Sequence, residues 1–318
     1  MEDIKVLTII GNGFDKHHEV KSSYKDYCIW LQKHEKELYD KINNLYNIKD
    51  INWWNDFERE LGTIDINSIA NEAFQTYISK NYDKDYVIAA ADAENELFFF
   101  FFAILATFNC WINELNPPIE SKKIQLEEDG FFINFNYTRT LQELYGIKDE
   151  QIFHIHGTKD SKPEDFILGH NVPFLTAIKR YIPNSEDKTE AEIDRAYWTL
   201  DSTESYIKHE FQDNIVNAFE GMRKNTEGII FNHRELFHSF KNVREIYVYG
   251  FSFSEIDLPY IDEIVNVIDT RIVQWVVSCH REEDKERVSR YMNSKGIPLF
   301  QENTLGAYRI IELHDVMI

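Results

Sequence analysis

The stretch from Gly130 to Gly157 reads GFFINFNYTRTLQELYGIKDEQIFHIHG and contains two short apolar runs with a helical pattern between them. The first run, Phe131–Phe135, follows a glycine and is rich in aromatic residues, which is typical of a buried strand. The second run, Ile152–Ile155, is apolar apart from one histidine. A strand, a helix and a second strand in this order indicate an α/β arrangement with a parallel sheet.

A polar side chain directly follows each of these two runs. Asn136 ends the first run, and His156 ends the second. Because ligands bind at the carboxyl ends of the strands in a parallel α/β sheet, we expect both side chains to line one concave site. The alternative is that Asn136 caps the following helix, as Thr138 or Thr140 also could, and that His156 forms a hydrogen bond in the core.

The alternation of strand and helix patterns continues along the rest of the chain. The first of the further runs, Ile4–Ile10, alternates little and is rich in Ile, Val and Leu, as expected for a strand that is covered on both faces. We therefore predict an α/β fold with a doubly wound, mainly parallel sheet. The further predicted strands are Ile4–Ile10, Asp165–Leu168, Glu245–Tyr249, Arg271–Ser278 and, at an edge, Tyr308–Leu313.

We expect a single domain over residues 1–318 with one helical insertion. Residues from about 172 to 226 are charged and helical in pattern, and they separate the predicted strands on either side. Another helical pattern contains the run Leu97–Phe108, which reads LFFFFFAILATF. This run is too short to span a bilayer and has polar neighbours, so it predicts a helix that is buried on all sides.

Composition and charge narrow the choice of partners. The chain of 318 residues has a formal net charge of −21, which repels phosphate backbones and argues against nucleic acid as a ligand. Its three cysteines lie far apart and suggest no disulfide framework, and the acidic start Met1-Glu2-Asp3 does not resemble a signal peptide. We therefore expect a cytoplasmic protein that binds neither nucleic acid nor membrane.

The segment Gly11-Asn12-Gly13-Phe14-Asp15 follows the first predicted strand. Glycines at such a turn let the backbone approach a phosphate group at the start of a helix. The dinucleotide-binding fingerprint requires a third glycine where this chain has Lys16, so a tight turn without a ligand is the alternative. Asp15 suits the positive end of a helix dipole, and in a functional site it would contact a ribose hydroxyl.

The ordered motifs resemble those of the abortive-infection AbiH family, a divergent sirtuin-like branch linked to defence against bacteriophages. The resemblance rests on GNGFD, on FNYT with the LQELY helix, on HIHG, and on two later elements, LGHN and GFSFSEIDLPY. It implies an NAD-binding core in which the last of these motifs lies near the adenosine side. The residues that it assigns to NAD binding are Gly11, Asn12, Gly13, Phe14, Asp15, Tyr137, Gly157, Gly250, Ser252 and Asp257. For Ser252 the expected contact is a phosphate and for Asp257 a ribose hydroxyl, with helix capping as the alternative for Asp257.

Asn136 and His156 are the predicted catalytic pair. Cleavage of the bond between ribose and nicotinamide passes through an oxocarbenium-like state, and the cationic leaving group needs little help from an acid. An amide such as Asn136 can orient the ribose and the attacking water. An imidazole such as His156 can accept the proton from that water near neutral pH. The resemblance assigns the same roles to these two residues.

Classical sirtuins carry a zinc held by paired cysteines, which this chain lacks. The resemblance therefore points to hydrolysis of NAD itself rather than to protein deacylation. The prediction is an NAD⁺ glycohydrolase in antiphage abortive infection, with NAD as substrate and no separate cofactor. A homo-oligomer and a phage-derived trigger or partner protein are further expectations.

Two other functions fit the sequence. The first is a nucleotide-binding sensor that binds NAD without turnover. The second is a metal-dependent hydrolase, because His154 and His156 are two residues apart and would face one side of a strand. In that case His170 or Asp257 would be a further ligand.

Overall fold

The computed structural model describes residues 4–80, 85–162, 165–179, 181–182, 185–197, 203–302 and 304–318. The chain forms two compact units. Unit 1 consists of Met1–Tyr27, Asn109–Ile167 and Asn225–Ile318, and unit 2 of Cys28–Phe108 and Leu168–Lys224. Unit 1 contains the sheet, and unit 2 is helical.

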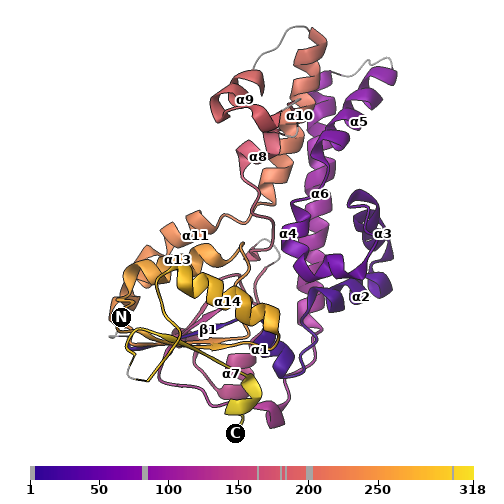
Figure 1. Cartoon of the computed structure of the whole chain (residues 1–318). Coiled ribbons are helices and arrows are strands. Elements are labelled where there is room, and N and C mark those ends of the chain that lie inside the picture. Colours follow the sequence, from indigo (N-terminus) through magenta and orange to yellow (C-terminus); the bar gives the residue numbers. More distant parts are fainter. Residues whose placement is uncertain are drawn as a thin grey trace. The chain divides into compact units, whose positions relative to one another are not determined.

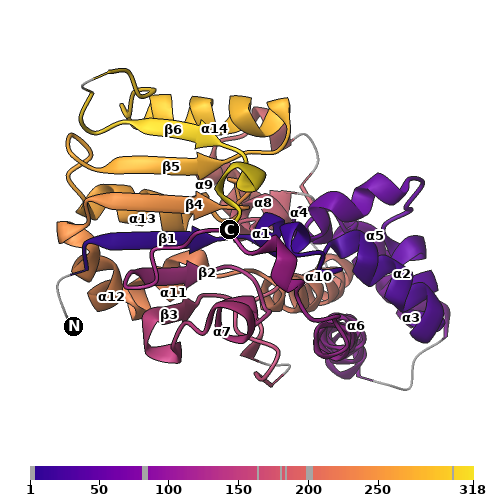
Figure 2. The same cartoon turned by 90° about the horizontal axis from the view of Figure 1, so that it is seen from below.

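Unit 1 is built on a six-stranded sheet in the order β3-β2-β1-β4-β5-β6, and every pair of neighbouring strands is parallel. Figure 2 shows the strands side by side, with β3 and β6 at the two edges. The predicted α/β fold with a parallel sheet is confirmed. The strands are β1 (Val6–Ile10), β2 (Phe131–Asn134), β3 (Ile152–His154), β4 (Glu245–Tyr249), β5 (Gln274–Ser278) and β6 (Tyr308–Ile311).

Helices cover both faces of this sheet (Figure 1). On one face, Phe14 and Leu141 pack against Ile10. On the other face, Ile9 belongs to a larger core that includes Tyr260. The doubly wound arrangement follows from this, because successive residues of β1 point to opposite sides and both sides are apolar. The helices of the first face are α1 (Asn12–His17) and α7 (Thr140–Tyr145), and those of the second are α11 (Thr226–Asn232), α12 (Arg234–Ser239), α13 (Leu258–Val267) and α14 (Glu282–Ser294).

The strand order reverses between β1 and β4. From β1, the sheet continues through β2 to β3 at one edge, and through β4 and β5 to β6 at the other edge. On the β2–β3 side, the register places Asn134 opposite His154. Asn136 and His156 each follow two residues later, at the carboxyl ends of neighbouring strands. The reversal point of an open parallel sheet is where ligands bind.

Unit 2 combines two segments that are far apart in the sequence. Within it, Phe74 of α5 and Phe211 of α10 share a small apolar core. The sequence predicted a helical insertion only for the second segment, at about 172–226. The helices are α2 (Tyr24–His34), α3 (Lys36–Leu45), α4 (Phe57–Leu61), α5 (Ile66–Ser79), α6 (Tyr86–Asn113), α8 (Phe174–Lys179), α9 (Glu190–Tyr197) and α10 (Thr203–Gly221), of which α2 and α6 extend into the ranges of unit 1. Short 3₁₀ helices across the chain are η1 (Ile51–Asp56), η2 (Glu120–Lys122), η3 (Asp149–Gln151), η5 (Ser185–Asp187), η6 (Phe240–Asn242) and η7 (Leu313–Val316).

The helix α6 is less buried than its sequence predicts. Phe99 is 64% exposed, and Phe98 and Phe102 are also exposed, so the prediction that this run is buried on all sides is wrong. The whole helix is longer than the apolar run and is long and apolar enough to cross a membrane by length and composition alone. A single helix of this kind is weak evidence for a membrane, because the core helices of soluble proteins pass the same test.

The predicted strand Asp165–Leu168 is absent. This segment follows the end of β3, and the Ile167 N–H donates to the carbonyl of His156. Phe166 stacks on the ring of Tyr137, with the ring centroids 5.3 Å apart. The segment is therefore apolar because it packs on the loops after β2 and β3, and not because it forms a strand of the sheet.

Candidate active site

The glycine turn after β1 packs its backbone against the end of β4. The N–H of Gly11 donates to the carbonyl of Tyr249 at 3.0 Å, and the N–H of Gly13 donates to the carbonyl of Gly250 at 2.8 Å. A β-carbon on Gly13 would lie 2.7 Å from the Cα of Gly250, and one on Gly250 would lie 2.0 Å from the nitrogen of Phe14. Gly250 also has a φ of +66°. This contact requires glycine whether or not a ligand binds.

Asn136 links the end of β2 to this turn. Its side-chain Nδ2 donates to the carbonyl of Gly11 at 3.1 Å, and its backbone N–H donates to Oδ1 of Asn134 at 3.0 Å. The helix α7 begins at Thr140, with Arg139 at the N-cap position, so Asn136 does not cap it. The predicted placement of Asn136 at the strand end, beside the glycine turn, therefore holds in the structure.

His156 lies among aromatic rings beyond the end of β3. Its imidazole is edge-on to Phe135, with the centroids 5.3 Å apart, and it is close to the rings of Tyr137 and Tyr260. The residue is 3% exposed. Its Nε2 lies 3.5 Å from Oδ1 of Asp257. The sequence suggested Asp257 beside His156 only as a possible metal ligand, whereas here the carboxylate lies directly beside the imidazole.

Asp257 stands at the N-cap position of α13, but its side chain makes no capping hydrogen bond. The carboxylate lies instead beside His156. A carboxylate next to an imidazole can hold the ring in one orientation and one tautomer. In the structure, Asp257 is therefore a neighbour of the predicted catalytic residue His156 and not a helix cap.

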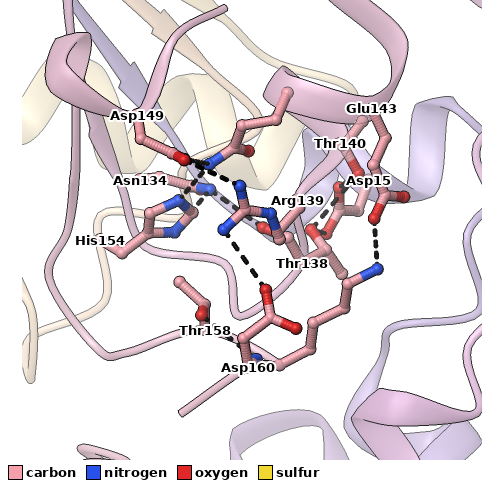
Figure 3. A network of polar contacts seen from close by, with 12 residues as sticks. Asp15, Asn134, Thr138, Arg139, Thr140, Glu143, Asp149, His154, Thr158 and Asp160 are labelled. Atoms are coloured by element: carbon pink, nitrogen blue, oxygen red, sulfur yellow. Dashed lines mark hydrogen bonds and ion pairs between the residues drawn. The ribbon is translucent and has the colours of Figure 1, made fainter.

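Asp15 is fully buried in the first turn of α1 and accepts two hydrogen bonds. Thr138 donates to Oδ2 at 2.5 Å, and Thr140 donates to Oδ1 at 2.6 Å. These contacts join the first turn of α1 to Thr138, which precedes α7, and to Thr140 at its start (Figure 3). Burial raises the pKa of the carboxyl to about 6, and the two hydroxyl donors oppose this shift. The two threonines serve this carboxylate, and neither caps α7, contrary to the sequence-based expectation.

Tyr137 and Gly157 shape the loop beyond β3. The hydroxyl of Tyr137 donates to the carbonyl of Ile167 at 3.0 Å. The N–H of Lys159 donates to the carbonyl of Tyr137 at 2.8 Å. Gly157 has a φ of +87°, and a β-carbon there would lie 3.1 Å from the carbonyl of Asp165. Both residues border His156 and hold the loop that follows it.

The remaining predicted binding residues occupy different surroundings. Phe14 is in the core of unit 1 and packs on Tyr145, so its ring is explained by packing. Oδ1 of Asn12 accepts from the hydroxyl of Ser22 at 2.5 Å. Ser252 is exposed in the loop after β4, where its carbonyl accepts from Nη1 of Arg287 at 2.7 Å. Of these three residues, only Ser252 is exposed.

A family model for bacteriophage abortive infection AbiH matches residues 7–279. The chain belongs to the AbiH family. The match begins within β1, extends to the end of β5 and includes Asn136, His156 and Asp257. No curated protein and no solved structure gave a significant match. The family description refers to phage abortive infection, and the likeness to sirtuins stays a prediction.

In this AbiH-family protein, His154 and His156 do not face the same side. Nε2 of His154 lies 2.8 Å from Nε2 of Gln142 on α7, whereas His156 faces α13. The prediction that both rings share one face is wrong because β3 ends at His154 and the chain turns there. Burial lowers the pKa of His154 to about 4, and the backbone carbonyl of Asn136 opposes this shift.

His170, the third ligand proposed for a metal, lies in unit 2. Its Nε2 is 3.0 Å from the carbonyl of Phe219, and its Nδ1 accepts from the N–H of Val172. The ring also stacks on Phe219 with the centroids 3.9 Å apart. Among the residues that the structure describes, no group of three or more His, Cys, Asp or Glu side chains is placed to hold a metal ion.

A charged network surrounds the outer side of α7 and was not anticipated. Arg139 pairs with Asp149 at 2.9 Å and with Asp160 at 3.3 Å, and Lys159 pairs with Glu143 (Figure 3). These residues form no sequence motif. Only the fold brings them together.

Proposed function

We propose that this AbiH-family protein is an NAD⁺ glycohydrolase that acts in phage abortive infection. The observation that carries the proposal is the gathering of polar groups where the strand order 3-2-1-4-5-6 reverses. Asn136 is bonded to the glycine turn there, and His156 with its carboxylate neighbour follows the adjacent strand. Sheets of this order bind dinucleotides at this edge.

The residues of the site suit the chemistry of hydrolysis. The bond between C1′ of the ribose and the pyridinium nitrogen breaks, and its electron pair leaves with nicotinamide. Water adds to C1′, and its proton passes to the imidazole of His156 and then to solvent, which gives ADP-ribose. Asn136 orients the ribose and the water through its amide. No metal and no separate cofactor take part in this scheme.

The proposed reaction agrees with the family's role. Loss of NAD would stop the metabolism of the infected cell, and phage replication would fail with it. We place the reaction in the cytoplasm, where the substrate is found. Such an enzyme must be held inactive in a healthy cell, so we propose control by self-association or by a phage-derived trigger.

A second candidate is a sensor that binds NAD without hydrolysing it. The observation in its favour is the burial of Asn136 and His156, whose side chains are held by contacts within the protein. Such groups can serve as fixed walls of a binding site as well as in catalysis. The two functions differ in one outcome, which is the appearance of free nicotinamide.

The test is incubation of the purified chain with NAD, followed by separation of the products. A hydrolase yields nicotinamide and ADP-ribose in equal amounts. A sensor binds NAD, as measured by calorimetry, and yields neither product. Absence of both binding and products, with and without phage lysate as a source of trigger, would contradict both candidates.

A further inference from the structure

The start of α13 leaves the side chain of Asp257 without a capping function. Capping side chains accept from the second or third residue of a helix. Here the second residue is Pro259, which has no N–H, and the N–H of Tyr260 already donates to the backbone carbonyl of Asp257 at 3.2 Å. The first residue, Leu258, donates to the carbonyl of Ser254 at 3.1 Å. The backbone therefore satisfies this helix end by itself.

The carboxylate of Asp257 is directed to the imidazole of His156. The separation of 3.5 Å between Oδ1 and Nε2 is longer than an ordinary N–H···O hydrogen bond. Contacts between catalytic groups are often long without a bound substrate. Both side chains are largely buried, and Phe135 and Tyr260 flank the imidazole. Hydrogen bonds are stronger in such apolar surroundings than in water.

We propose that Asp257 is a positioning residue that fixes the tautomer of His156. An N–H on Nε2 that donates to Asp257 leaves the lone pair on Nδ1. Nδ1 is then the atom that accepts the proton from the attacking water, and the carboxylate stabilises the imidazolium that forms. The role of Nδ1 as a base rests on the proposed function. The proposed tautomer of His156 is independent of that function.

The first part of the test is a spectroscopic measurement that needs no NAD. Protein with ¹⁵N-labelled histidine gives long-range proton–nitrogen correlations that distinguish the two tautomers, and His156→Gln identifies the signals of His156. We expect the parent protein to carry the proton on Nε2. A proton on Nδ1 overturns the proposal, and because this measurement uses the parent chain, it does not depend on the folding of any Asp257 variant.

The second part uses Asp257→Asn with Glu255→Gln as its matched control. Glu255 is exposed in the same loop, two residues earlier, so its substitution removes one negative charge without touching His156. We expect Asp257→Asn to lower kcat by about 10²-fold, with KM changed by less than about threefold, and Glu255→Gln to match the parent. Equal kcat values for Asp257→Asn and the parent contradict the proposal. If the parent protein releases no nicotinamide, only the proposed function is contradicted. The tautomer measured by NMR then still shows whether Asp257 positions His156.

Discussion

The side-chain amide of Asn136 donates to the backbone carbonyl of Gly11 over 3.1 Å and so ties the end of β2 to the turn after β1. Gly13 in that turn donates to Gly250 after β4. Three strand ends therefore form one hydrogen-bonded unit at the point where the strand order reverses. Substitutions in any of these loops are expected to affect the others.

The contact between the two glycine-containing loops predicts a large loss of stability for Gly250→Ala. The new β-carbon would lie 2.0 Å from the nitrogen of Phe14, and the backbone has a φ of +66°. The matched control is Gly296→Ala, where φ is +70° and no atom lies within 4 Å of the new β-carbon. We expect the control to cost about 1 kcal/mol from backbone strain alone and Gly250→Ala to cost at least about 2 kcal/mol more in chemical unfolding. Equal losses would show that the loops do not pack as described.

Asp15 predicts a specific dependence of stability on pH. Its folded pKa of about 6 lies above the ordinary value of 3.8, so the folded protein binds more protons than the unfolded chain between these pH values. The contribution of Asp15 to the free energy of unfolding therefore falls as the pH rises from about 4 to about 6 and is constant above that range. Asp15→Asn removes this dependence, so its stability relative to the parent should improve by about 2 kcal/mol between pH 4 and pH 7.

The control for Asp15→Asn is Asp129→Asn at an exposed position. The difference between the free energies of unfolding of Asp129→Asn and the parent should be the same at pH 4 and at pH 7. Urea unfolding at pH 4, 5, 6 and 7 measures all three proteins. A difference between Asp15→Asn and the parent that does not change with pH would be at odds with the raised pKa.

Unit 2 contains a buried ion pair that predicts a strong coupling between two residues. Nζ of Lys224 lies 3.2 and 3.3 Å from the two carboxylate oxygens of Glu58, and the side chains are 0% and 10% exposed. Lys224→Met leaves a buried carboxylate unpaired and should cost about 3–5 kcal/mol. The double variant with Glu58→Gln should recover part of this loss. The control Lys36→Met, from an exposed pair, should cost less than about 1 kcal/mol, and a similar cost for Lys224→Met would contradict the account.

Local sequence patterns were sufficient to predict most of the sheet. The run from Ile4 to Ile10 and the run before Asn136 are mostly apolar, without strict alternation, because helices cover both faces of their strands. The segment Asp165–Leu168 has a similar pattern, but its aromatic residue packs on Tyr137 outside the sheet. Hydrophobicity alone does not distinguish these two environments.

The same limit applies to the candidate site. Asn136 was predicted at the carboxyl end of a strand because strand ends can be recognised in the sequence. Asp257 was considered beside His156 only as a metal ligand, so the direct pairing of the two side chains was missed. Asp257 is distant in sequence, and only the fold brings its carboxylate beside the imidazole of His156. The burial of Glu58 likewise cannot be recognised locally, because its charged partner Lys224 lies in a different segment of unit 2.

Divalent metal ions should have no effect on NAD hydrolysis. His154 and His156 are directed to different sides of β3, and His170 is engaged with the backbone of unit 2. Nicotinamide release should therefore be the same before and after treatment with a chelator, with the metal content followed by elemental analysis. Activity that disappears with bound zinc and returns on its addition would favour the metal-dependent hydrolase instead.

The most direct test of the account is the rate of nicotinamide release by the parent protein and by His156→Gln, which keeps much of the side-chain volume. If His156 accepts the proton from water, the variant should be slower by roughly 10²–10⁴-fold, or about 3–5 kcal/mol of barrier, with little change in NAD affinity. His238→Ala, at an exposed position on the helix before β4, should retain the parent rate. A folded His156→Gln protein that releases nicotinamide at the parent rate, or a parent that binds NAD and releases none, would contradict the central claim.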